Sequence, residues 1–480
     1  MSISGGVSES APQTVALATV KRALPRTPTF VDTRSWVFWV GCAITLYGAI
    51  TWMPLVMGRL QSHPATAVLS AIAWLMYGFV FIVILYRMEL FERRSPITVL
   101  GALAWGGLAA PGMAAVAAPA MHDIVTAVVP VPDEWVASFA APLVEEPLKW
   151  LGVVALAMIP GARVRSAADG LFYGAVIGLG FQVSESFLYT AVISADGTAT
   201  TVFAMVLLRG VVGGLWNHPT YTAMAGAGVG YFFNASASRG RRWFVLLGTL
   251  GLAMAVHGFF DTPIVNANVW ISSITKGVPV LVLFLIVLRW AHLRERRTFA
   301  GLAAEVVPDD LVSPAHFRLL AARRTRREVR REAKRAAGRA ADRTLKYFQG
   351  AQLSLLTATH EDGWGSPRTE ELSRDVAELR DELIEIYREA GVTRGPGLGL
   401  IDRPERRRST RALQDWAGQT RERIDTEGLR TVARSTGEIA IRKIPKRRPR
   451  TSEVATTDQF PTGAQAPTTG LDEPAEPKQD

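Results

Sequence analysis

The chain has 480 residues, of which 49% are hydrophobic, and a formal net charge of +10. The charge is unevenly distributed: Lys and Arg number 17 up to Leu293 and 36 beyond it, and Asp and Glu number 13 and 30. The charge-poor first part contains apolar runs of about 18–25 residues, long enough to cross a hydrocarbon core, which excludes a wholly soluble protein. The single cysteine, Cys42, lies inside such a run and excludes both intrachain disulfides and cysteine-built metal sites.

Eight hydrophobic segments predict an all-α, polytopic transmembrane bundle of about eight spans. The predicted spans are 36–58, 66–86, 97–118, 136–159, 169–193, 203–233, 243–260 and 277–291. The sixth is long and is predicted to break around Asn217-His218-Pro219, because proline has no backbone N–H to donate. Residues 1–35 are polar and lack the apolar core of a signal peptide, so we expect them to form a disordered cytoplasmic N-terminus.

Basic residues alternate from loop to loop along the predicted spans. They gather before the first span, in the second, fourth and sixth loops, and after the last span, whereas Arg59 and Lys276 are the sole cations of the intervening loops. Cytoplasmic loops carry the excess of Lys and Arg in membrane proteins. We therefore expect a multi-pass protein of the cell membrane with both termini in the cytoplasm and residues 119–135 outside.

The chain beyond residue 291 is predicted to be a separate cytoplasmic region, with basic helices over 292–441 and a disordered tail over 442–480. Residues 315–348 are typical of a strongly basic helix, which favours an anionic inner leaflet as its neighbour over a specific nucleic acid. A short hydrophobic seam follows, and it predicts a helix that packs on the first one or on another copy; its residues are Leu372, Val376, Leu379, Leu383 and Ile386.

Ionisable residues inside the spans are the most informative feature of the membrane part. Each is expected to cost about 2.5–3.5 kcal/mol on insertion, so a purely structural role should not need many. The predicted spans contain Glu145, Glu146, Lys149, Glu185 and Arg209. His218 and His257 add imidazoles, and Asp261 lies four residues after His257, where its carboxylate can orient the ring.

The depths of these groups are predicted to coincide. With the orientation above, Glu145 and Glu146 lie about 15 Å, and Glu185 about 12 Å, from the outer ends of their spans at a rise of about 1.5 Å per residue. His257 lies toward the outward end of the seventh span. These groups should therefore meet in a wet polar cavity in the outer half of the membrane.

Four motifs in this region resemble those of the PrsW family of intramembrane proteases, which are similar to the CAAX/Abi-type membrane proteases. Glu145-Glu146-Pro147-Leu148-Lys149 resembles the family's EExxK pattern, and AADGLFYGAVIGLGFQVSES at 167–186 resembles its glycine-rich helix. Asn217-His218 and His257-Gly258-Phe259-Phe260-Asp261 follow in the family's order. The resemblance covers residues 140–262 and implies that 36–291 is a transmembrane protease-like domain.

The resemblance implies hydrolysis of membrane-anchored protein substrates, which in this family include an anti-sigma factor cleaved on its extracytoplasmic side. Glu145 or Glu146 is then the candidate base, His218 helps to polarise the water, and His257, steadied by Asp261, is the candidate oxyanion donor. Lys149, Glu185 and Asn217 are supporting residues.

A metal-dependent version is also open to the sequence. Glu146, His218 and His257 would supply the three protein ligands of one catalytic zinc ion, with water as the fourth. We favour the metal-free version slightly, because two widely separated histidines are weak evidence for a metal.

Two other classes of function remain open at this stage. A non-catalytic membrane scaffold of the same fold would use the polar pairs for packing and bind partner helices. A small-solute carrier would line its path with the charged residues, but the inverted repeat that would favour a carrier is not visible in the sequence.

Overall fold

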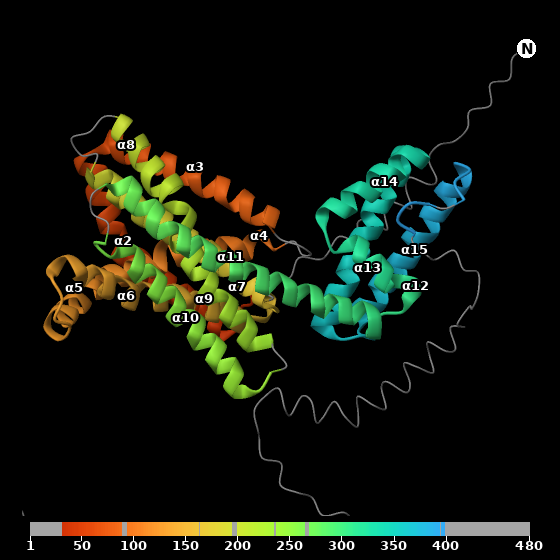
Figure 1. Cartoon of the computed structure of the whole chain (residues 1–480), viewed down its shortest axis with the longest axis horizontal. Helices are drawn as coiled ribbons and strands as arrows, with labels where there is room; N and C mark the ends of the chain where they lie inside the picture. The colour runs from red at the N-terminus through yellow and green to blue at the C-terminus, as the bar shows by residue number, and fades with distance from the viewer. Residues whose placement is uncertain are drawn as a thin grey trace, which may run out of the picture. The chain divides into compact units, whose positions relative to one another are not determined.

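The computed structural model describes residues 31–88, 94–162, 164–193, 199–234, 237–264, 268–393 and 395–398. Within these ranges the chain forms helices and no strand (Figure 1). The expected structure of residues 1–30 and of the tail from 399 onward, including 442–480, lies outside the described residues.

Every predicted span coincides with helical structure. The first two spans are α2 (Trp36–Ser62) and α3 (Pro64–Met88), and the third combines α4 (Pro96–Ala104), a π-helical turn η1 (Trp105–Ala109) and α5 (Ala110–Val128). The fourth is α6 (Asp133–Met158), followed by a short 3-10 turn η2 (Pro160–Ala162), and the fifth is α7 (Ala167–Ile193). The last two are α10 (Arg239–Asp261) and α11 (Val269–Gly301).

The sixth span is broken, as predicted. It consists of α8 (Ala199–Met205), a π-helical stretch η3 (Val206–Val212), a 3-10 turn η4 (Gly214–Trp216) and α9 (His218–Asn234). Asn217 separates the last two with an extended backbone (φ −99°, ψ −151°), and its side-chain oxygen accepts a hydrogen bond of 2.8 Å from the His218 N–H. Pro219 lies in the first turn of α9, where a helix does not need its missing N–H.

Six helical segments of the described chain are long and apolar enough to cross a membrane, against the eight spans predicted. They are Trp36–Ser62, Pro64–Arg87, Pro96–Val128, Ala167–Ile193, Arg239–Asp261 and Val269–Val306. The two predicted spans outside this set are the fourth, which contains Glu145, Glu146 and Lys149 within α6, and the broken sixth, whose α9 has 17 residues. These two segments are the ones that contribute most of the polar groups described below.

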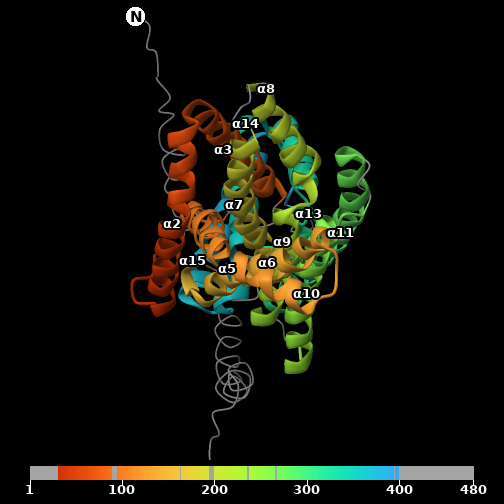
Figure 2. The ribbon, with the colours of Figure 1, turned by 90° about the vertical axis from the view of Figure 1, so that its left-hand side faces the viewer.

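Helix α7 occupies the centre of the bundle and packs most extensively against α9 (Figures 1 and 2). A row of glycines permits this approach: a Cβ on Gly174 would lie 2.2 Å from the carbonyl oxygen of Thr222, and one on Gly178 would lie 2.3 Å from that of His218. Small residues at such positions allow helix backbones in membranes to come close together. The stripe thereby sets the position of the N-terminal end of α9.

The outward faces of the bundle are apolar. Large hydrophobic side chains of α3 and α10 are exposed, among them Leu75, Met76, Phe79 and Phe244. Such continuous apolar exposure is what a bilayer-facing surface requires.

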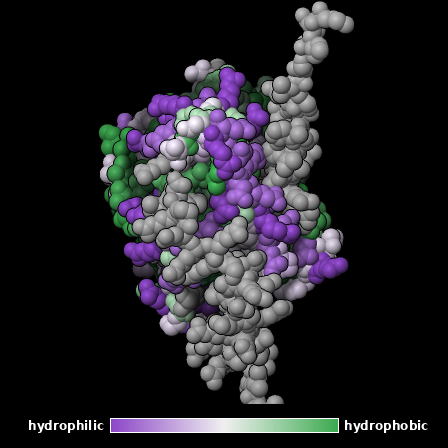
Figure 3. Space-filling view, turned by 90° about the vertical axis from the view of Figure 1, so that its right-hand side faces the viewer, coloured by the Kyte–Doolittle hydropathy of each residue, from purple (hydrophilic) through white to green (hydrophobic). Residues whose placement is uncertain are grey.

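The region beyond α11 forms its own helical group with its own core. After a π-helical turn η5 (Leu302–Val306) come α12 (Asp309–Val312), α13 (Pro314–Leu320), α14 (Arg323–Asp362) and α15 (Pro367–Glu389). The predicted basic helix 315–348 was wrong in its bounds: α13 ends at Leu320, and α14 continues to Asp362 with non-helical dihedral angles at Ala337 and Gly338. Hydrophilic side chains dominate the face that Figure 3 shows.

The predicted hydrophobic seam of α15 lies in that core. Leu372, Val376, Leu379 and Leu383 are buried, with Ile386 partly buried against the same cluster. Their partners include Leu345 and Leu355 of α14. The seam therefore packs on the preceding helix, which is one of the two arrangements that the sequence predicted.

Candidate active site

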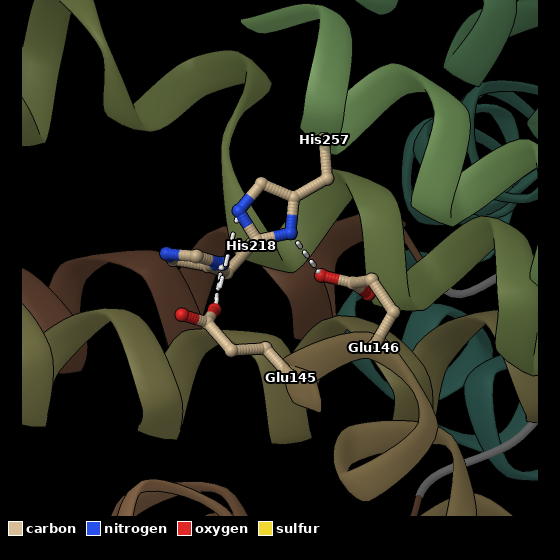
Figure 4. Close-up of side chains that lie close together, drawn as sticks. All are labelled: Glu145, Glu146, His218 and His257. Atoms are coloured by element: carbon tan, nitrogen blue, oxygen red, sulfur yellow. Dashed lines mark hydrogen bonds and ion pairs between the residues drawn. The ribbon is translucent and has the colours of Figure 1, made fainter. Parts of the chain in front are cut away.

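Four helices bring the predicted site residues together in the membrane part. Helix α6 carries Glu145, Glu146 and Lys149, α7 carries Glu185, α9 begins at His218, and α10 carries His257 and Asp261. Figure 4 shows both glutamates of α6 facing the two imidazoles. The helices converge there because α6 packs on α9 and α10 while α7 and α9 are in close contact.

Glu146 lies at the buried side of the cluster with a fully enclosed side chain. Its Oε1 is 2.6 Å from the Lys149 ammonium nitrogen and 2.9 Å from His257 Nδ1. The Thr222 hydroxyl donates to its other oxygen at 3.5 Å. A charge this deep is tolerated because the opposite charge and several donors surround it.

The partners of His218 assign its tautomer. Lys149 Nζ lies 2.9 Å from Nδ1, and an ammonium can only donate, so Nδ1 is the accepting nitrogen. Nε2 then carries the proton and donates to Glu185 Oε2 at 3.1 Å. The ring is thus held neutral and in one orientation by a carboxylate on one side and an ammonium on the other.

His257 is held between carboxylates. Its Nδ1 contacts Glu146, and its Nε2 lies 3.2 Å from Asp261 Oδ2 and 4.0 Å from Glu145 Oε2. The ring of Tyr221 stacks on the imidazole at a centroid distance of 5.0 Å. Each ring nitrogen of His257 therefore faces an acceptor.

Glu145 lies at the accessible side of the same cluster. Its side chain is 15% exposed, whereas those of Glu146 and Lys149 are 0% exposed. Its contacts are long: Oε2 is 3.4 Å from Lys149 Nζ and 3.8 Å from His218 Nδ1. Adjacent positions of one helix point about 100° apart, so the Glu146 carboxylate is enclosed while the Glu145 carboxylate is partly exposed.

An ion pair between Arg209 and Glu185 lies at the partly exposed side of the cluster. Arg209 of η3 donates from Nη2 to Glu185 Oε2 at 2.7 Å and from Nε to the Ser186 hydroxyl at 3.4 Å. The Arg209 and Glu185 side chains are 25% and 20% exposed. The arginine therefore fixes the carboxylate that in turn orients His218.

The structure shows the contact of one supporting residue, Asn217, and adds two neighbours to the cluster. Asn217 uses its side chain to accept from the backbone at the start of α9, and it orients His218 through the main chain. The Phe181 ring faces Lys149 Nζ at 4.3 Å, and Tyr221 stacks on His257. The only feature of the sequence that could have indicated these two aromatic residues is that each lies one helical turn from a site residue.

The four side chains of Glu145, Glu146, His218 and His257 form a donor set of the kind that a divalent metal takes. Each offers one ligand atom, and these atoms all lie within 4.8 Å of one another. Two imidazoles and carboxylate oxygens in a secluded pocket are the ligand types of catalytic zinc centres, so the chemistry of the donors fits a metal. The Lys149 ammonium lies among the same four side chains.

An all-helical, lipid-facing bundle that converges paired carboxylates and imidazoles on a buried point has the fold and the site of an intramembrane hydrolase. Residues 94–290, which contain the whole cluster, match the model of the PrsW family intramembrane metalloproteases. The match supports a peptidase of the membrane, a class of enzyme that acts on membrane proteins. No curated protein and no solved structure matches the chain.

Proposed function

We propose that the chain hydrolyses peptide bonds of membrane-anchored proteins in the outer half of the membrane, with Glu145 as the base. The observation that carries this proposal is the asymmetry of the glutamate pair: Glu146 is enclosed and bonded to Lys149 and His257, while Glu145 is partly exposed and only loosely contacted. A base must reach a water molecule, and Glu145 is the member of the pair that can.

The reaction needs a proton acceptor, a donor to the developing oxyanion and a proton for the leaving amine. Glu145 takes a proton from the attacking water as the water oxygen bonds to the peptide carbonyl carbon and the carbonyl oxygen becomes an oxyanion. Glu145 then returns that proton to the peptide nitrogen as the C–N bond breaks and the carboxyl group forms. His257 Nε2 lies 3.2 Å from Asp261 Oδ2 and 4.0 Å from Glu145 Oε2, and it is the donor that we assign to the oxyanion.

The remaining residues position these groups. Glu146 joins α6 to α10 through His257, and Lys149 joins α6 to α9 through His218. Glu185 orients His218 from the other side. A divalent ion, if held by Glu146, His218 and His257, would supply Lewis-acid polarisation of the water and the scissile carbonyl, with Glu145 left as the base.

The sidedness predicted from the loop cations supports an extracytoplasmic outlet for the site, with both termini in the cytoplasm. An anti-sigma-factor-like protein with a single span is the substrate class that the family resemblance favours. Exposed cations of α14, such as Arg327, Arg331 and Arg335, support contact of this region with an anionic leaflet.

Cleavage of a panel of single-span reporter proteins in proteoliposomes tests the proposal. We expect Glu145→Gln to lower kcat by about 10² or more, the range for loss of an acid–base group. Glu146→Gln should lower kcat as well, because Lys149 and His257 lose the anion that positions them. Asp123→Asn, at a side chain that is 87% exposed, is the matched control and should cleave at the parental rate. Folded glutamine variants that cleave as fast as the parent would show that the protein does not use these carboxylates, whereas a folded parent that cleaves none of the reporters would favour a scaffold.

A further inference from the structure

The Lys149 side chain lies where a cation at the centre of the donor set would lie. Its ammonium contacts three of the four donor side chains: Glu146 Oε1 at 2.6 Å, His218 Nδ1 at 2.9 Å and Glu145 Oε2 at 3.4 Å. The lysine is fully buried. An ammonium has three protons, and each has an acceptor here.

The spacing of the donors matches this ammonium. Ligands bind zinc at about 2.0–2.2 Å, whereas hydrogen bonds to an ammonium are about 2.7–2.9 Å long. The Glu146 and His218 atoms lie 2.6 and 2.9 Å from Lys149 Nζ, close to the range for hydrogen bonds, and the Glu145 oxygen lies farther away at 3.4 Å. All three distances are longer than zinc–ligand bonds. Two cations within such a distance also repel each other strongly in a buried site.

We propose that Lys149 and a divalent metal are alternative occupants of one position, so that metal binding requires the ammonium to leave the cluster. The contacts of His218 support this proposal. Its Nδ1 accepts a hydrogen bond from Lys149, and its Nε2 donates to Glu185. The same nitrogen cannot accept from the ammonium and ligate a metal. The inference rests on the proposed function, in which these donors bind the metal.

If the ammonium and the metal exclude each other, Lys149 does more than orient its neighbours Glu146 and His218. With the lysine in place the two carboxylates are compensated during insertion and folding, and the protein is stable without metal. With metal in place the counter-charge is replaced, and the hydrogen bond between Lys149 and His218 is lost. The lysine therefore sets how tightly the site holds its metal.

Zinc binding by purified full-length protein, measured by equilibrium dialysis against buffered zinc ion, tests this exclusion. We expect Lys149→Met and Lys149→Gln to bind zinc about 10-fold or more tightly than the parent, because the competing cation is gone. Lys149→Arg keeps the charge and should bind no more tightly than the parent. Lys276→Met is a matched control: this lysine is also buried, but it donates to the Thr262 carbonyl at 2.7 Å, so its loss should leave zinc affinity unchanged.

The outcomes separate the inference from the proposed function. Equal or weaker zinc binding by both neutral variants, or zinc binding by none of the proteins, would overturn the exclusion, while parental cleavage of reporter proteins would still uphold the protease. If the neutral variants fold only when zinc is added, the exclusion is supported, because the metal then replaces the ammonium. If neither folds even with zinc, the metal does not replace the lysine and the inference is wrong.

Discussion

Two adjacent glutamates of one helix have different environments, and this difference governs their chemistry. Glu146 has a fully enclosed side chain and is bonded to Lys149 and His257, whereas Glu145 is 15% exposed and has its nearest partner at 3.4 Å. A carboxylate with short, buried contacts is a structural counter-charge. A carboxylate with loose contacts near an opening is free to exchange protons with water.

The contrast predicts different stabilities for the two glutamine variants. Glu146→Gln leaves the buried Lys149 without its closest anion and should lower the free energy of unfolding by about 3–5 kcal/mol, the range for breaking a buried ion pair. Glu145→Gln should lower it by clearly less. Thermal unfolding in one detergent, followed by fluorescence, would measure both, and equal losses would contradict the assignment of distinct environments.

Arg209 offers a second test at the residue scale. Since it fixes Glu185, which orients His218, Arg209→Met should lower kcat by about 10-fold or more, with little change in KM. Arg209→Lys keeps a charge beside Glu185 and should recover part of the rate. Arg289→Met, at an exposed arginine of α11, is the matched control. A loss confined to KM would instead place Arg209 in substrate binding.

At the scale of elements, the contact between α7 and α9 positions the first residue of α9. A methyl group at Gly178 would lie 2.3 Å from the His218 carbonyl oxygen and 2.8 Å from Pro219 Cα, so the N-terminal end of α9 would have to move. Gly178→Ala should therefore displace His218, which belongs to the site, as well as loosen the packing of the two helices.

We expect Gly178→Ala to lower the free energy of unfolding by about 1–3 kcal/mol, as overpacking does, and to reduce cleavage by about 10-fold or more. Gly248→Ala on α10 has no atom within 4 Å of the added methyl group and is the control. Its stability should be equal to or slightly above that of the parent, because alanine favours the helix. Parental cleavage by a stable Gly178→Ala protein would show that α9 is not held by this contact.

At the scale of the whole molecule, the orientation in the membrane is open to a direct measurement. The alternating loop cations predict that residues 119–135 face outward and that both termini are cytoplasmic. Cysteine labelling at position 122, after replacement of Cys42, should occur in intact cells with an impermeant reagent. Labelling only after the cells are opened would reverse the orientation and would place the outlet of the site on the cytoplasmic side.

The C-terminal region is expected to be dispensable for chemistry. Its core, which begins at Phe299, lies entirely after residue 297, and the donor cluster lies entirely before it. Truncation after residue 297 should therefore leave cleavage detectable, with any change in rate due to lost contact with substrate or membrane. Complete loss of cleavage by an inserted, monodisperse truncated protein would give this region a direct part in catalysis.

Local patterns in the sequence predicted most of the helices and the identity of the site residues. A run of apolar residues of membrane-spanning length specifies a helix by itself, because backbone groups in lipid must bond within their own segment. An ionisable residue inside such a run is equally visible, since its insertion is costly. Glu145, Glu146, Lys149, Glu185, His218, His257 and Asp261 were all predicted in this way, and all lie in one cluster.

Other features of the site depend on how side chains from several helices point toward one another, and these were visible only in the tertiary structure. The sequence left the two glutamates equivalent, because exposure is a property of the packed bundle and not of either residue. It also left the contact between Lys149 and His218 unseen, since 69 positions separate them and the packing of α6 against α9 places the imidazole beside the ammonium. The bounds of α14 were missed for a related reason: Ala337 and Gly338 have non-helical dihedral angles, with a positive φ of 80° at Gly338, and two helical parts meet there at a kink.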